Sequence, residues 1–123
     1  MQITLTAHPQ YLRALVRRRQ GAEEGRAAAL SIVEGLRQHG LKRLLVVSEE
    51  NDPVFRVEQY GLADWLRQIS SLGLEKAALV SDSREVFASH QYIELLASQR
   101  GVVVKAFREE KQALSWLLDK PAG

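Results

Sequence analysis

The side chains of this sequence that could do chemistry gather in two short polar segments, each directly after an apolar run. The segments cover residues 48–52 (SEEND) and 81–83 (SDS). Carboxylate oxygens are ligands that Mg²⁺ prefers in proteins. If both segments meet at one edge of a sheet, four acids could share a cation: Glu49, Glu50, Asp52 and Asp82. The commoner role of such residues is as solvated loop acids and helix caps.

Ser81, Asp82 and Ser83 offer a second chemistry, because they precede a predicted helix. Hydroxyl groups and backbone N–H groups at a helix N-terminus bind anions. No glycine-rich loop accompanies these residues, so a nucleotide cradle is not expected. Asp82 and Glu85 are also spaced like a capping box, and a capping role is sufficient to explain the segment.

The residue types that commonly carry catalysis form no recognisable constellation. Cysteine is absent, so thiol chemistry is excluded and zinc would need His and carboxylate ligands. His8, His39 and His90 are not paired at metal-binding spacing, and no serine lies in a G-x-S-x-G elbow. His90 falls on the apolar side of its helix, where we expect a core or edge histidine that is satisfied by a neighbour. We therefore expect a non-enzymatic protein with no cofactor and no metal.

The composition of the chain limits the kinds of partner that it is expected to bind. Seventeen basic residues against fifteen acidic ones give a net charge of +2, whereas nucleic-acid binding needs clustered Lys and Arg. The run Arg17-Arg18-Arg19 is the nearest approach, and we interpret it as a solvated strand end. The apolar runs are strand-length, so no membrane span is predicted. No signal-like stretch opens the chain, and a cytoplasmic protein is expected.

Strands alternate with helices along the chain and must position these residues. Alternating apolar and polar residues predict two opening strands, 2–7 and 11–18, joined by a turn at His8-Pro9-Gln10 as an antiparallel hairpin. Further strands are predicted at residues 44–47, 77–80 and 102–107, and helices at 22–39, 57–72, 82–99 and 109–119.

This order predicts an α/β fold with a five-stranded mixed sheet, in which an N-terminal hairpin is followed by parallel β-α repeats packed with about four helices. We expect one domain over residues 1–120 and a short tail at 121–123. The hairpin leaves a strand edge that needs protection, which is compatible with a homodimer.

Three segments carry a resemblance to a known family: LKRLLVV, LEKAALVSDSREVF and VVVKAFREEKQALSWLLD. Together with the opening hairpin they resemble the SpoIIAA-like family, which has a STAS-type fold. The resemblance covers nearly the whole chain, and its motifs are packing motifs. It implies a five-stranded mixed sheet and a regulatory role. Antagonists of this fold carry a phosphorylatable serine in an Asp-Ser motif, which is absent from SEENDPVFRVEQYG here.

The family is also similar to CRAL-TRIO lipid-exchange domains, which implies an apolar ligand between helices and sheet. The helix predicted at residues 57–72 would form the wall of such a pocket, with Tyr60, Leu62, Trp65, Leu66 and Ile69. The same spacing is typical of ordinary core packing. We therefore expect a regulatory or binding module that acts through a partner protein or a small apolar, lipid-like ligand. The alternative is a metal- or anion-dependent switch or enzyme that uses the acidic segments.

Overall fold

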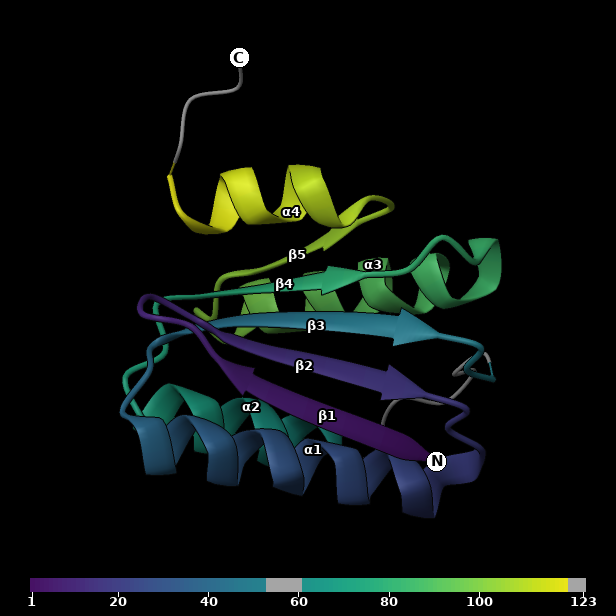
Figure 1. The fold of residues 1–123 in the computed structure, drawn as a ribbon, viewed down its shortest axis with the longest axis horizontal. Helices are drawn as coiled ribbons and strands as arrows, with labels where there is room; N and C mark the ends of the chain where they lie inside the picture. Colours follow the sequence, from purple (N-terminus) through teal and green to yellow (C-terminus); the bar gives the residue numbers. More distant parts are fainter. Residues whose placement is uncertain (53–60, 120–123) are drawn as a thin grey trace.

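A computed structural model describes residues 1–52 and 61–119 (Figure 1). The elements, in chain order, are β1 (Gln2–Ala7), β2 (Leu12–Arg17), α1 (Gly21–His39), β3 (Arg43–Glu49), α2 (Leu62–Ser71), β4 (Lys76–Val80), α3 (Arg84–Gln99), β5 (Val104–Phe107) and α4 (Glu110–Leu117). The expected α/β class is confirmed, with a five-stranded mixed sheet and four helices in the described part of the chain.

The strands lie across the sheet in the order β1-β2-β3-β4-β5. β1 pairs antiparallel with β2, which confirms the predicted hairpin, and β2 to β5 are parallel. The hairpin turn is closed by the His8 N–H, which donates to the Tyr11 carbonyl at 2.9 Å. Each parallel strand lies beside its predecessor in the chain, and crossovers of one hand place their helices on one face. Helices α1, α2 and α3 therefore share a face of the sheet, and α4 lies on the other (Figure 1).

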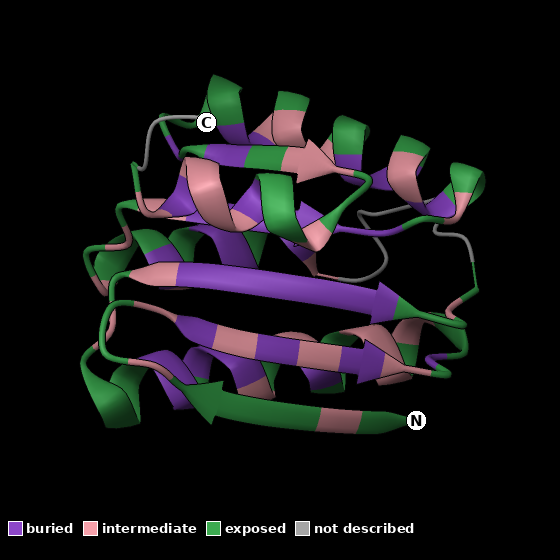
Figure 2. Ribbon diagram, turned by 45° about the horizontal axis from the view of Figure 1, so that its top comes forward, coloured by how far each residue is buried: buried purple, intermediate pink, exposed green. Residues whose placement is uncertain are grey.

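Alternate strand residues point to opposite faces, so each face has its own core. The larger core lies beneath α1, α2 and α3 and takes Leu12, Ala14 and Val16 from β2. The smaller core joins Leu45, Val47, Ala78 and Val80 of the sheet to Ala113 and Leu117 of α4. β3 is buried along most of its length, whereas β1 is exposed at five of its six residues (Figure 2).

The helix boundaries differ from the predicted ones by a few residues. α3 begins at Arg84 because Ser83, and not Asp82, is its N-cap: the Ser83 hydroxyl accepts a hydrogen bond from the Val86 N–H at 3.4 Å. α2 begins at Leu62, and residues 57–60 of the predicted helix lie outside the described residues, as does the expected tail at 121–123. The last helix ends at Leu117, two residues early.

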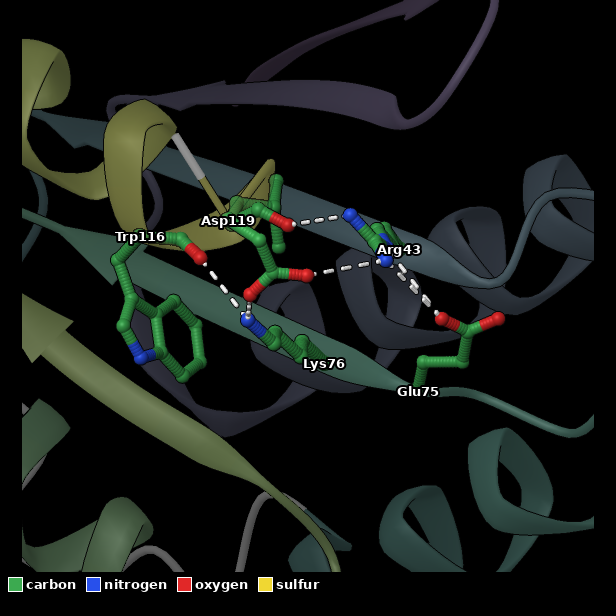
Figure 3. A network of polar contacts seen from close by, with 6 residues as sticks. Arg43, Glu75, Lys76, Trp116 and Asp119 are labelled. Atoms are coloured by element: carbon green, nitrogen blue, oxygen red, sulfur yellow. Dashed lines mark hydrogen bonds and ion pairs between the residues drawn. The ribbon is translucent and has the colours of Figure 1, made fainter. Parts of the chain in front are cut away.

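The C-terminal end of α4 is held by two cations at the start of β3 and β4 (Figure 3). Arg43 donates to the Leu117 carbonyl at 2.9 Å, and Lys76 donates to the Trp116 carbonyl at 3.0 Å. Asp119 forms ion pairs with both cations. Cations at a helix C-terminus satisfy carbonyls that lack a helical partner and interact favourably with the helix dipole. This network therefore has a structural role, which is to dock α4.

Candidate functional site

A pocket of about 130 Å³ lies between the sheet and the three helices of the larger core. Its strand residues come from the carboxyl-terminal halves of β2, β3 and β4, near the end where ligands bind in open α/β sheets. Most of its wall is apolar: Val16, Gly25, Ala28, Ala29, Ile32, Val46, Leu62, Leu79 and Ile93. The volume is below the roughly 300–1,000 Å³ of drug-sized sites. It is close to the roughly 150 Å³ of an apolar cavity that binds benzene.

The pocket has space because α1 presents small residues at its N-terminal half. Gly25, Ala28 and Ala29 follow the i, i+3, i+4 spacing of one helix face, and all three line the pocket. Further along the same face, Ile32 and Leu36 have larger side chains that fill the space against the sheet, where both are buried. A larger residue at position 28 would therefore occupy the pocket.

Four polar side chains interrupt the apolar wall, and all of them are nearly buried. The exposed fractions are 8% for Arg19, 8% for Ser48, 9% for Trp65 and 7% for His90. Within the described lining, Arg19 carries the one formal charge. The pocket thus combines a small apolar body with a few polar groups, which is the usual composition of a small-molecule site.

Arg19 is positioned by the loop that follows β3. The Arg19 backbone N–H donates to Asn51 Oδ1 at 2.9 Å, and its Nη2 donates to the Asp52 carbonyl at 2.8 Å. Asn51 in turn donates from Nδ2 to the Val16 carbonyl at 3.1 Å. These bonds place the guanidinium in the core, so the interpretation of the arginine run as a solvated strand end is wrong for Arg19.

The other two arginines of the run do lie at the surface or near it. Arg17 forms an ion pair with Glu49 at 3.4 Å, and exposed Arg18 forms one with Glu50 at 3.0 Å. The hydrogen bond and the charge of Arg18 lower the pKa of the Glu50 carboxyl. Two of the four acids proposed for a cation site are thus engaged by arginine.

His90 and Trp65 line the pocket, and each has a polar atom that is buried and unsatisfied. His90 Nδ1 and Trp65 Nε1 are buried and have no hydrogen-bond partner within residues 1–52 and 61–119. The expected burial of His90 is confirmed, but the expected neighbour for Nδ1 is not found there. Burial, assisted by the charge of Arg19, lowers the pKa of His90 to about 4. The ring is therefore neutral at pH 7, with one nitrogen as donor and the other as acceptor.

Only some of the residues predicted to form the wall of a ligand pocket line the pocket in the structure. Leu62 and Trp65 line the pocket. Leu66 and Ile69 are fully buried in the larger core, between α2 and the sheet, and do not line the pocket. Tyr60 lies outside the described residues.

The predicted anion segment serves as the start of α3. Ser81 is buried and its Oγ accepts a hydrogen bond from the Ser83 N–H at 3.1 Å, while Ser83 caps the helix. Asp82 is exposed, and its carbonyl accepts a hydrogen bond from Arg108. In the part of the chain that the structure describes, no group of three or more His, Asp or Glu residues is arranged to hold a metal ion.

Three polar residues of the pocket were not predicted as ligand-binding: Arg19, Ser48 and His90. The sequence could have indicated His90, because this residue falls on the apolar side of α3. It could also have indicated Ser48, because this residue follows a buried run at a strand end. No local pattern indicates Arg19, since its burial depends on hydrogen bonds to a loop more than thirty residues away along the chain.

Fold and pocket together define an α/β protein with a small, mostly apolar pocket beneath three helices. Comparisons with protein-family models and with curated proteins find no match to this chain. Among the described helices, none has the length and apolar character needed to cross a membrane.

Proposed function

We propose that this protein is a non-enzymatic binding module for a small apolar ligand, with a regulatory role. The pocket between the sheet and α1, α2 and α3 carries this proposal, because it is mostly apolar and lies near the ligand-binding end of the strands. A ligand in it would contact three helices and the sheet at once. Its binding energy would then add to the stability of the folded state.

The polar residues of the pocket favour binding over catalysis. Ser48 and His90 are a nucleophile and a base by residue type, and both line the pocket. A catalytic base works best when its pKa is near the working pH. The pKa of His90 is lowered to about 4 by burial and the charge of Arg19, so His90 is a weak base at neutral pH.

Membership of the SpoIIAA-like family is part of the proposal and supplies its regulatory side. The five-stranded mixed sheet that the resemblance implies is present. In such a module, occupation of the pocket would change the surface that a partner protein meets.

The proposal is tested with a variant in which a larger side chain fills the pocket. Ala28→Leu adds bulk at a buried wall position, and Ala27→Leu adds the same bulk at an exposed position one residue away. The full chain is purified from its source under native conditions, and bound compounds are identified by mass spectrometry. Toluene, as an apolar probe, is added separately and the free energy of unfolding is measured.

We expect the wild type and Ala27→Leu to retain the same compound and, after that compound is removed by unfolding and refolding, to be stabilised by toluene, whereas Ala28→Leu shows neither effect. A probe at a hundred times its Kd raises the free energy of unfolding by about 2.7 kcal/mol. The proposal is overturned if Ala28→Leu retains the compound as well as the wild type does. It is also overturned if no compound is retained and toluene leaves the wild type unchanged.

A further inference from the structure

We infer that the ligand of this pocket carries a hydroxyl group on its apolar body, and that Ser48, near the end of β3, forms a hydrogen bond with that group. The inference rests on the proposed function, because it names the ligand chemistry for the same pocket. It is drawn from the direction in which Ser48 points and from the hydrogen-bonding state of its side chain.

The alternation of side chains along β3 directs Ser48 to the face of the sheet that carries α1, α2 and α3. Val46 and Leu44, two and four residues earlier, belong to the larger core on that face, and residues two apart in a strand point the same way. The register places Ser48 beside Val16 of β2, and both residues line the pocket together with Val46. The short side chain of Ser48 therefore faces the pocket and not the smaller core.

The hydroxyl group of Ser48 is nearly buried but is still open to a molecule in the pocket. The residue is 8% exposed, and its Oγ forms no hydrogen bond within the part of the chain that the structure describes. Trp65 Nε1 and His90 Nδ1 also lack a partner there, but these two atoms are fully enclosed, whereas Ser48 Oγ is not. A ligand in the pocket can therefore reach Ser48 Oγ and supply the missing hydrogen bond.

The chemistry of this wall favours a neutral hydroxyl group on the ligand. A serine hydroxyl both donates and accepts hydrogen bonds, and a ligand hydroxyl does the same, so the pair can bond in either direction. A charged group would instead lose its hydration among the apolar residues of the wall. The volume of about 130 Å³ has room for a body of benzene size. The ligand class is therefore a small apolar alcohol or phenol, for which phenol itself is the probe.

The test compares phenol with toluene, which has a methyl group in place of the hydroxyl and nearly the same shape. The full chain is unfolded and refolded to remove any retained compound, and the Kd of each probe is measured by calorimetry. Ser48→Ala removes the hydroxyl group at the pocket. Ser81→Ala is the matched control, because Ser81 is a buried serine directly after the neighbouring strand β4 and does not line the pocket.

We expect Ser48→Ala to weaken phenol binding about fivefold relative to toluene binding, as the loss of one neutral hydrogen bond predicts. Ser81→Ala should leave the ratio of the two Kd values unchanged. If Ser48→Ala has the wild-type ratio, or if Ser81→Ala changes the ratio equally, the inference is overturned and the proposed function stands. If neither probe binds the wild type, both fail.

A second variant at the same position keeps the test decisive if Ser48→Ala does not fold. Ser48→Cys has a side chain of similar size, and its thiol is a weak donor and a weak acceptor. Phenol binding relative to toluene binding is expected to weaken in this variant too. A wild-type ratio in Ser48→Cys would then overturn the inference.

Discussion

At the residue scale, His90 shows how the surroundings of one side chain set its charge. The ring is almost enclosed by the core between α3 and the sheet, where an imidazolium would lose its hydration. Burial is the larger cause of the lowered pKa, and the nearby guanidinium of Arg19 is the smaller one. The folded protein therefore keeps His90 neutral at pH values where the unfolded chain protonates it.

This difference predicts a loss of stability in mild acid. The folded pKa of His90 is about 4 and the ordinary value is 6.5. Between these pH values the unfolded state binds one more proton, so the free energy of unfolding falls as the pH falls. The expected loss is about 3 kcal/mol between pH 6.5 and pH 4. Urea unfolding at a series of pH values measures it.

The control is His90→Gln, which has a polar side chain that does not titrate. Carboxyl groups lose their native contributions in the same pH range in both proteins, so the difference between the two curves isolates His90. We expect the wild-type curve to fall more steeply than that of the variant. Parallel curves would contradict the assignment of a neutral, buried imidazole.

At the scale of elements, the position of α4 depends on a contact between distant parts of the chain. Arg13 of β2 donates two hydrogen bonds to Glu110 in the first turn of α4, from Nε to Oε2 at 2.7 Å and from Nη2 to Oε1 at 2.9 Å. The hydrogen bond from Arg13 lowers the pKa of Glu110, and its positive charge adds to the effect. The pair fastens the N-terminal end of the helix, as Arg43 and Lys76 fasten its C-terminal end (Figure 3).

A double-mutant cycle with Arg13→Met and Glu110→Gln is expected to give a coupling free energy of about 1 kcal/mol. The value is modest because both side chains are partly open to water, which screens the pair. It is still measurable because bidentate, charge-assisted hydrogen bonds are among the stronger ones. The free energy of unfolding is measured by denaturant titration for the wild type, both single variants and the double variant.

The exposed pair Arg18–Glu50, with one hydrogen bond, is the matched comparison. Its cycle is expected to give a smaller coupling, since two flexible and hydrated side chains gain little from pairing. Equal couplings in the two cycles would contradict the role assigned to Arg13 and Glu110 in docking α4.

At the scale of the whole molecule, the described sheet ends at β1, an edge strand that lacks the usual protective residues. β1 pairs with β2 on one side and is the edge of the described sheet on the other. Its six residues, QITLTA, include no charged residue and no proline, which are the devices that usually protect an edge strand. Such a strand favours pairing with a second copy of itself.

We therefore expect a homodimer in which two β1 strands pair at their edges. Thr4→Lys combined with Thr6→Lys adds charge to exposed positions of β1 and is expected to give a monomer, because like charges on adjoining strands repel. Gln38→Lys, at an exposed position of α1, is the control and should remain dimeric. Native mass spectrometry or light scattering gives the mass. A monomeric wild type, or a dimer that tolerates both lysines, would contradict this assembly.

Local patterns in the sequence determined the elements and their order. Alternation in β2 and the helical stripe of α1 are properties of neighbouring residues, and they predict the hairpin and the β-α repeats. The mixed sheet then follows from general rules of chain connection. Helix ends were less certain, because Ser83 and Asp82 are both good N-caps and only the path of the backbone selects between them.

Tertiary structure alone decided where the pocket lies and which side chains reach it. The wall joins Ala28, Leu62 and His90 from three different helices, and no local pattern states that they meet. The spacing in α2 does not distinguish Trp65, which lines the pocket, from Ile69, which fills the core. Arg19 is buried by hydrogen bonds to a distant loop. Periodicity is set by the nearest neighbours in the chain, whereas a pocket is set by packing between segments that the fold brings together.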